Sequence, residues 1–322
     1  MCSETHILTN AEVNRFDPTR TTVLRNSFAK DMKRRFTELS RTILKTVIEN
    51  DAFGLDINVF QMTPARKKQF AFPRSQDKIR AFMLWLEEQV RLGILEVDQF
   101  QQLGQGIERA WTNKYITDSY KRGIQRARYE VKKAGFEVPS IEQTGGVDMA
   151  LTVPVHIDRL GLMYTRTFSD LKGITQTMDT QISRVLSQRL ADGEGPRVLA
   201  RKMIAVVNGA KSGELGLDVS YINKSGNQVN YFLPAERRAE ILARTEVIRA
   251  HHQATIQEYK NWGVEGVNVQ GEWKTAGDGR VCEECEALEG QIFTLEEINN
   301  KIPLHPQCRC IALPYIYEPV IK

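Results

Sequence analysis

The chain lacks three features that would each have assigned it to a broad class of protein. It has no run of roughly 18 uninterrupted apolar residues, which a helix needs to cross a bilayer. Its amino terminus, MCSETHILTNAEVNRFDP, has no apolar signal core, so we expect synthesis in a reducing cytoplasm. Its net charge of +4 is too small to mark a dedicated nucleic-acid-binding protein.

Cysteine is also scarce, and its distribution is uneven. The 322 residues contain five cysteines, and four of them lie between Cys282 and Cys310. In a reducing compartment such a cluster is typical of a metal site or a catalytic site rather than of disulfides. Hydrophobic residues make up 41% of the chain and charged residues 26%, which excludes wholesale disorder and predicts a buried core.

One long amphipathic helix is predicted near the amino terminus. Asp17 and Pro18 have the pattern of an N-cap followed by a proline in the first turn. A single apolar stripe then recurs every three or four residues, at Leu24, Phe28, Met32, Phe36, Leu39, Ile43 and Val47. A helix with one such stripe has to lie along another long helix or a partner protein.

Most of the remaining chain also has helical periodicity. We predict helices over 75–90 with Ser75 as cap, 98–103, 106–134 with Gly135 ending it, 158–171, 174–190, 196–207 and 234–262. Residues 208–230 suit a loop or small hairpin, and the segment VNVQGEWKT after Gly263 suits a strand. The predicted fold is mostly α, with a long helical amino-terminal arm and a small α+β carboxy-terminal domain.

The carboxy-terminal cysteines have the spacing of a metal site. Cys282-x-x-Cys285 is followed after 19 residues by His305-x-x-Cys308-x-Cys310. Two cysteines two residues apart can place both thiolates on one side of a tight turn, and a second such pair completes a tetrahedral zinc site with Zn–S distances of about 2.3 Å. The segment between the pairs has little core of its own, so a zinc ion would stabilise its folded state.

Five donors compete for four positions in this site. We predict Cys282, Cys285, His305 and Cys308 as ligands of a structural Zn²⁺, with Cys310 as the alternative to one of the late donors. Free or disulfide-bonded cysteines are one alternative. A catalytic zinc is another, which would need an open coordination position and a general base among the nearby glutamates, Glu283, Glu284 and Glu286.

With these residues identified, the chain resembles the phage Mu F-like family of head morphogenesis proteins. The resemblance rests on Arg244-Thr245-Glu246, Trp273, Asp278, Cys282-x-x-Cys285-x-x-Leu288-x-Gly290 and the terminal string from His305 to Cys310. It implies a minor capsid protein in the virion head that associates with the portal protein during assembly and influences DNA packaging or ejection. Major capsid or scaffolding proteins are further candidate partners. Contact with genomic DNA would be weak.

The sequence leaves two other functions to consider. An enzyme or toxin-like effector could use the region of Arg244 and Glu246, but the chain shows no clear nucleophile and base, and we expect no appended enzyme in the 12 residues after Cys310. A nucleic-acid-binding knuckle is disfavoured because residues 282–300 contain six glutamates and no lysine or arginine. Basic residues at 66–68 and along 121–128 are better candidates for a phosphate contact.

These observations predict three consecutive domains and a protein that is not an enzyme. Residues 1–150 would form the helical arm that docks on the portal or capsid. Residues 151–262 would form a helical core, and residues 263–322 a zinc-knuckle lobe packed on the preceding helices. Within the core, we expect Arg244, Thr245 and Glu246 to pair with polar turns of the lobe, with Glu246 and Asp278 buried in ion pairs.

Overall fold

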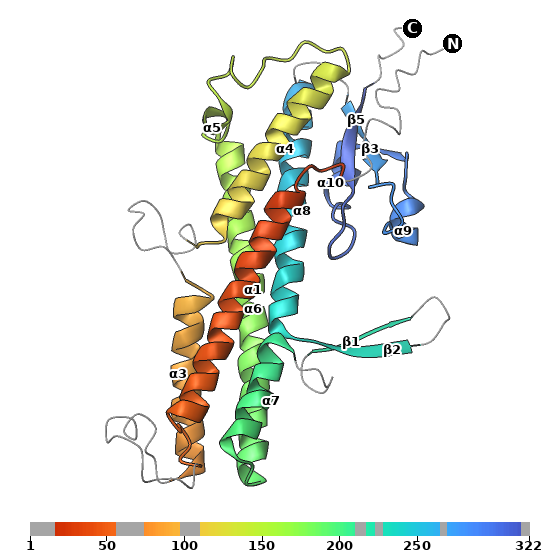
Figure 1. Ribbon diagram of the computed structural model, residues 1–322. Helices are drawn as coiled ribbons and strands as arrows, with labels where there is room; N and C mark the ends of the chain where they lie inside the picture. Colours follow the sequence, from red (N-terminus) through yellow and green to blue (C-terminus); the bar gives the residue numbers. More distant parts are fainter. Residues whose placement is uncertain are drawn as a thin grey trace. The chain divides into compact units, whose positions relative to one another are not determined.

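The computed structural model describes residues 17–55, 74–96, 110–209, 217–222, 228–264 and 269–316 (Figure 1). The protein is mostly helical with a small three-stranded sheet near its carboxy terminus, which confirms the predicted fold class. Packing divides the chain into two compact units. Unit 1 comprises Met1–Phe28, Gln101–Thr167 and Ile241–Lys322, and unit 2 comprises Ala29–Phe100 and Phe168–Glu240. The three predicted domains, residues 1–150, 151–262 and 263–322, stay a prediction.

The elements follow one another in a simple order. The helices are α1 (Thr22–Leu44), the π-helical turn η1 (Lys45–Glu49), α3 (Ser75–Gly93), α4 (Asn113–Lys133), α5 (Val147–Ala150), α6 (Pro154–Ala191), α7 (Pro196–Asn208), α8 (Ala235–Val264), α9 (Glu283–Glu286) and α10 (Leu295–Asn299). The strands are β1 (Leu217–Ile222), β2 (Gln228–Leu233), β3 (Val269–Lys274), β4 (Ile292–Phe293) and β5 (Ile311–Ile316). None of the helices in the described ranges is both long and apolar enough to cross a membrane.

The apolar stripe is buried as predicted. Its six residues in helix α1, from Leu24 to Ile43, are at most 7% exposed, and the seventh, Val47, is buried in the following turn η1. The start of α1 differs from the prediction. The helix begins at Thr22, and Pro18 lies in the turn before it. The Asp17 carboxylate accepts hydrogen bonds from the Thr21 N–H at 3.1 Å and the Thr22 hydroxyl at 2.6 Å, and it pairs with Arg25 at 2.7 Å. Asp17 therefore anchors the helix from one turn further upstream than a simple N-cap.

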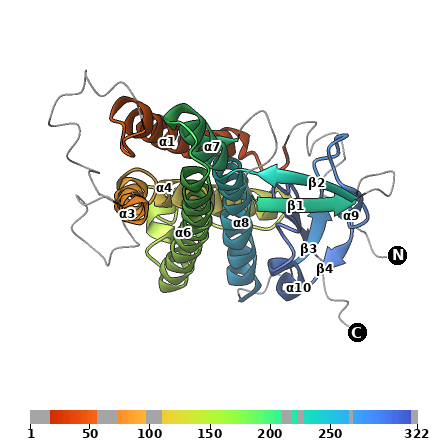
Figure 2. The same cartoon turned by 90° about the horizontal axis from the view of Figure 1, so that it is seen from below.

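Unit 2 contains α3, α7 and the predicted hairpin. Helix α3 begins at Ser75, but Arg74 is the capping residue and no side-chain cap bond forms, so the predicted Ser75 cap is wrong. Helix α7 starts at Pro196 and packs against η1. Strands β1 and β2 are antiparallel, with Leu217 opposite Leu233, and Figure 2 shows the two arrows pointing in opposite directions. This confirms the small hairpin expected within residues 208–230.

Helix α6 is one continuous element, whereas the sequence predicted two helices separated near Gly173. A glycine inside a helix costs only about 1 kcal/mol relative to alanine. Leu171 and Met178, on either side of it, are both buried, and their burial outweighs this cost. The Gly173 carbonyl also accepts the Thr177 hydroxyl at 2.9 Å.

In unit 1, helix α4 crosses α8 at a close contact that only glycine permits. A Cβ atom at Gly123 would lie 2.7 Å from Ala254 Cβ, and the Gly123 carbonyl accepts the Thr255 hydroxyl at 3.3 Å. Helix α4 ends as predicted, with Gly135 just beyond it at φ +91°. Figure 1 shows α4 alongside the carboxy-terminal part of α8.

The carboxy-terminal lobe of unit 1 (residues 269–316) is built on a sheet with the order β4-β3-β5. Helix α10 packs on β3 at Gly271, where a Cβ atom would lie 2.9 Å from Ile298 Cδ1. Trp273 of β3 is fully buried in a core shared with residues of α4 and α8, among them Val131, Ile256 and Tyr259. Helices α4 and α8 therefore supply part of the core on which the lobe packs.

Two predictions fall in segments outside the described residues. They are the basic run Arg66, Lys67 and Lys68 and the short helix over 98–103. Both stay predictions.

Candidate metal centre

The first ligand turn is formed by Cys282 and Cys285. Cys282 is the N-cap of the short helix α9, and its Sγ accepts the backbone N–H of Cys285 at 3.4 Å. An N–H···S bond of this kind needs the extended backbone of Cys282 followed by a helical turn, and the Cys-x-x-Cys spacing provides both. The two sulfur atoms consequently lie on one side of the turn, as the sequence predicts.

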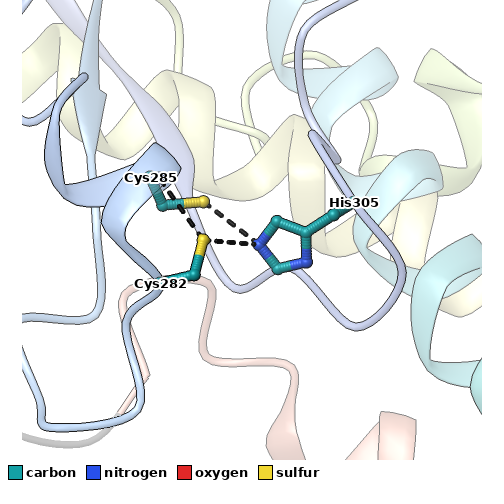
Figure 3. A group of neighbouring side chains, drawn as sticks. All are labelled: Cys282, Cys285 and His305. Carbon is teal, nitrogen blue, oxygen red and sulfur yellow. Dashed lines mark hydrogen bonds between the residues drawn. The ribbon is translucent and has the colours of Figure 1, made fainter. Parts of the chain in front are cut away.

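His305 faces both of these sulfur atoms (Figure 3). Its Nε2 lies 3.3 Å from Cys282 Sγ and 3.2 Å from Cys285 Sγ. Its Nδ1 lies 2.9 Å from the carbonyl oxygen of Pro306. In the tautomer that donates the Nδ1 proton to this carbonyl, the Nε2 lone pair is free to bind a metal, which is the usual arrangement of a metal-binding histidine.

The other two cysteines approach the same centre from the buried side. The backbone N–H of Cys308 donates to the His305 carbonyl at 3.1 Å, which closes the turn, and Cys308 Sγ lies 3.9 Å from Cys285 Sγ. Cys310, two residues on in extended chain, points to the same side as Cys308. The donor atoms of Cys285, Cys308 and Cys310 lie within 4.8 Å of one another, and all three residues are buried.

The donors therefore form two groups of three that share Cys285. The outer group is Cys282, Cys285 and His305, with Cys282 and His305 half-buried, and the inner group is Cys285, Cys308 and Cys310. Either group could hold a metal ion. The structure brings together all five donors that the spacing singled out. The choice of Cys308 over Cys310 stays a prediction.

The separations suit a tetrahedral ion with thiolate and imidazole ligands. Zinc–ligand lengths of about 2.3 Å to sulfur and 2.0–2.1 Å to nitrogen require about 3.8 Å between sulfurs and about 3.5 Å between sulfur and nitrogen. The observed values are 3.9 Å for Cys285 and Cys308 and 3.2–3.3 Å for the two contacts of His305. These three separations fit one ion, whereas Cys308 is not within 4.8 Å of every donor of the outer group and has to move closer to complete a four-ligand site.

The protonation of the thiols also suits a cation site. Burial raises the pKa of Cys285, and a hydrogen bond to Cys308 raises that of Cys310, whereas the same bond lowers the pKa of Cys308. Without a cation, burial and the neighbouring sulfurs thus keep Cys285 and Cys310 protonated. A bound divalent cation stabilises several thiolates at once, which is why cysteine clusters of this density are typical of metal sites.

An ion pair joins the two halves of the centre. The Asp278 carboxylate accepts two hydrogen bonds from Arg309 at 2.6 and 2.7 Å, in a bidentate arrangement. Asp278 lies just before the first ligand turn, and Arg309 lies between Cys308 and Cys310. The Arg309 guanidinium holds the pKa of Asp278 well below its usual range. The sequence predicted an ion pair for Asp278, which is confirmed, but it did not identify Arg309 as the partner. The prediction that this ion pair is buried is wrong, because the Asp278 side chain is 22% exposed.

Helix α8 contacts the lobe through three side chains spaced seven residues apart and through Gln253, whose Nε2 donates to the Asn299 carbonyl at 2.9 Å. The Thr245 hydroxyl accepts the backbone N–H of Gln307 at 3.0 Å. His252 Nε2 lies 2.9 Å from the carbonyl of Ile298, and the Tyr259 hydroxyl donates to the carbonyl of Ala312 at 3.4 Å. Seven residues make nearly two helical turns, so these three side chains lie along one face of α8. We call these three side chains the docking seam.

The Arg244-Thr245-Glu246 motif is thus partly explained. The expectation that Thr245 pairs with a turn of the lobe is confirmed. Glu246 is buried at 2% exposure and pairs with Arg249 at 3.0 Å and Arg166 at 3.6 Å, which confirms a buried ion pair. Nothing in the structure explains Arg244.

The other midchain histidines are packing residues of unit 1. His156 Nδ1 lies 2.8 Å from the Tyr120 hydroxyl, and its Nε2 lies 3.5 Å from the Glu258 carboxylate. This resembles a hydroxyl–imidazole–carboxylate chain, but all three side chains are buried, and burial raises the pKa of the Tyr120 hydroxyl well above its usual range. Burial also lowers the pKa of His252 to about 4, so His252 is neutral in its contact with Ile298.

Three basic residues of α4 form ion pairs within unit 1. Lys121 pairs with Asp148 at 2.6 Å, Arg128 pairs with Glu258 at 2.9 Å, and Arg126 pairs with Glu130. Arg126 and Arg128 are only 10% and 11% exposed. This stretch therefore offers little cationic surface to a phosphate backbone.

A protein-family model matches the part of the chain that contains the cysteine and histidine motif of the lobe. Residues 180–313 match the family model described as Phage Mu protein F like protein. This segment includes the Arg-Thr-Glu motif, the docking seam and all five metal-ligand candidates, so the match confirms the family resemblance for this part of the chain. No curated protein and no solved structure matches the chain.

Proposed function

We propose that this chain, whose residues 180–313 are phage Mu F-like, is a minor head protein that acts in phage head morphogenesis. The observation that carries the proposal is the family match, because it spans helix α8 and the carboxy-terminal lobe, which share one packed core. The proposed place of action is the head of the virion, after synthesis in the host cytoplasm.

In this proposal the carboxy-terminal lobe is stabilised by one structural zinc ion. Cys282, Cys285, His305 and Cys308 hold it, and the Asp278–Arg309 pair keeps the two ligand turns in register. The ion supplies the free energy that the lobe cannot obtain from its own core, since a structural zinc site contributes directly to folding. The contacts of Thr245, His252 and Tyr259 in the docking seam attach the zinc-stabilised lobe to α8.

We further propose that the protein acts by binding and not by catalysis. A catalytic metal site needs a general base close to the metal. The glutamates that adjoin the first ligand turn, Glu283, Glu284 and Glu286, are exposed on α9, which disfavours this role for them. The buried Tyr120–His156–Glu258 chain has no access to a substrate. Residues 282–300 of the lobe expose six glutamates and contain no lysine or arginine, which disfavours nucleic acid as the ligand of this face and favours a protein partner.

The proposed principal partner is the portal protein, with major capsid or scaffolding proteins as further candidates. Association with the portal would place a few copies in the prohead and would let the protein influence DNA packaging or ejection. The internal ion pairs of α4 support only a weak contact with genomic DNA.

The metal part of the proposal is tested by elemental mass spectrometry of the purified full chain. We expect about one zinc per chain in the wild type and a loss of zinc in Cys282→Ser and Cys285→Ser. The matched control is Cys2→Ser, which removes the cysteine that lies outside the cluster and should leave the zinc in place. A zinc-free wild-type chain with a folded lobe would contradict the zinc site.

The assembly part is tested independently of metal. The chain is co-expressed with the portal protein of the same phage genome, and complexes are separated by size and analysed for stoichiometry. Co-elution at a fixed ratio supports the proposal. Absence of the chain from purified proheads and virions, measured by mass spectrometry, would contradict it.

A further inference from the structure

The centre contains one donor more than a tetrahedral ion can use. The outer and inner groups share Cys285, and together they present four sulfur atoms and one imidazole nitrogen. Zinc is stable both with three thiolates and a histidine and with four thiolates. The surplus donor is Cys310 or His305, and Cys310 is a buried member of the core whose sulfur lies within 4.8 Å of two other ligand candidates.

His305 is the donor that can most readily leave. It is half-buried, and its Nδ1 contact is with the carbonyl of Pro306, its neighbour in the same loop. The flanking residues Leu304 and Pro306 are exposed. The imidazole is therefore held to the centre mainly by its contacts with the two sulfurs of the first turn.

Cys310 is placed on the opposite, buried side and is firmly held. It directly precedes β5, whose first residue, Ile311, pairs with Lys274 of the central strand β3. Its donor atom lies within 4.8 Å of those of Cys285 and Cys308. Sulfurs on one zinc ion lie about 3.8 Å apart, so the separation of Cys310 from these two donors is close to that of ligands of a single ion. A four-thiolate set also needs Cys282 to approach Cys308 and Cys310, with which it shares no group of this size.

We infer that Cys310 is a reserve ligand, which replaces His305 when the imidazole leaves the ion. This inference rests on the zinc site of the proposed function. The centre then has two ligand sets that differ in one donor, Cys282, Cys285 and Cys308 being common to both. The histidine set is the resident one, because exchanging a neutral imidazole for a thiolate adds a negative charge to a buried site. Softer ions such as Cd²⁺ favour the four-thiolate set.

The experiment compares four full-length chains: wild type, His305→Ala, Cys310→Ser and the double variant. Zinc per chain is measured by elemental mass spectrometry, affinity by competition with a chelator, and the number of thiolate ligands by the charge-transfer absorption of the Co²⁺ form. We expect each single variant to keep about one zinc, with four thiolates in His305→Ala and three in Cys310→Ser. In the double variant the loss of affinity should exceed the product of the single losses by about tenfold or more.

The outcomes separate this inference from the proposed zinc site. If the wild type binds no zinc, the zinc site itself fails. If the wild type binds zinc but His305→Ala loses it as completely as the double variant, or its Co²⁺ form retains three thiolates, the reserve role is overturned. Should His305→Ala fail to fold, His305→Gln takes its place. The Cd²⁺ form of the wild type provides a second test. We expect its ¹¹³Cd NMR chemical shift to indicate four sulfur ligands. A shift typical of three sulfurs and one nitrogen would contradict the inference.

Discussion

The hydroxyl of Thr245 joins two backbone groups that lie far apart in the chain. It donates to the carbonyl of Ile241 at 2.7 Å within α8 and accepts the N–H of Gln307 at 3.0 Å, 62 residues away. Gln307 lies between His305 and Cys308, in the loop that carries the late metal-ligand candidates, and has φ +62°. One side chain thus fixes a strained ligand loop to a helix.

Replacing Thr245 by valine keeps the shape of the side chain and removes this connection. The Gln307 N–H would then lack a partner, so we expect Thr245→Val to lower the free energy of unfolding by about 1–2 kcal/mol, measured by denaturant titration. The matched control is Thr165→Val, because Thr165 bonds only within the exposed face of α6, to Gly161 at 2.9 Å. That change should cost less than about 0.5 kcal/mol. Equal losses in both variants would mean that the contact contributes nothing specific.

A second prediction concerns the crossing of α4 and α8. A Cβ atom at Gly123 would lie 2.7 Å from Ala254 Cβ, with the backbone of His251 also in contact, so Gly123→Ala forces the helices apart. We expect a loss of about 1–3 kcal/mol in stability. Gly161→Ala is the control, since no atom lies within 4 Å of a Cβ placed there, and its better helix propensity should stabilise α6 by up to about 1 kcal/mol. The two variants should therefore shift the thermal midpoint in opposite directions.

A third prediction concerns the pH dependence of unit 2. The Asp179 side chain has a buried Oδ1 without a hydrogen-bond partner, and burial, with a smaller contribution from Glu87, raises its pKa to about 7. The native state then binds more protons than the unfolded state between pH 4 and pH 7, so this group makes stability fall as pH rises through that window. Asp179→Asn should remove the effect. The variant should gain stability over the wild type at pH 8, by at most about 4 kcal/mol, and gain nothing near pH 4.

The control for this pH effect is Asp158→Asn, which changes an exposed carboxylate on the same helix. Denaturant titrations of the three chains at pH 5 and pH 8 provide the comparison. The burial argument is wrong if Asp179→Asn and the wild type show the same difference in stability between the two pH values.

A fourth prediction concerns the Asp278–Arg309 ion pair. Arg309→Ala leaves the first ligand turn unattached to the second, so we expect zinc affinity to fall by about tenfold to a hundredfold, as for other residues that orient metal ligands. Arg280→Ala is the control, because Arg280 also pairs with Asp278, at 3.0 Å, but is 76% exposed and belongs to the same turn. Affinity is measured by chelator competition. An equal fall in both variants would argue for a general charge effect.

The sequence predicted α1 well and α6 poorly, for related reasons. The stripe from Leu24 to Val47 is local information, since its spacing alone places all seven residues on one face. The continuity of α6 is not local. Gly173 has an intrinsic preference to interrupt a helix, and the burial of Leu171 and Met178 overrides it. Only the packed structure shows that this burial is available.

The same distinction applies to the centre. The spacing of cysteine and histidine identified all five donors. A tight turn brings together two residues that have two others between them, independently of the rest of the fold. The pairing of Asp278 with Arg309 spans 31 residues, and that of His252 with Ile298 spans 46. No periodicity encodes such contacts. An acidic residue before one ligand turn and an arginine inside the other were the available signal for the first pair.

The seven-residue spacing of the docking seam restricts how α8 can change in length. Each added residue turns a helix by about 100° and lengthens it by 1.5 Å. After an insertion between Thr245 and Tyr259, the contact of Thr245 with Gln307 and that of Tyr259 with Ala312 could no longer form together. Even a seven-residue insertion, which restores the face, would displace the contact by more than 10 Å. Length variation in this architecture must therefore fall before Thr245 or after Tyr259, and residues 245–259 form a segment of fixed length.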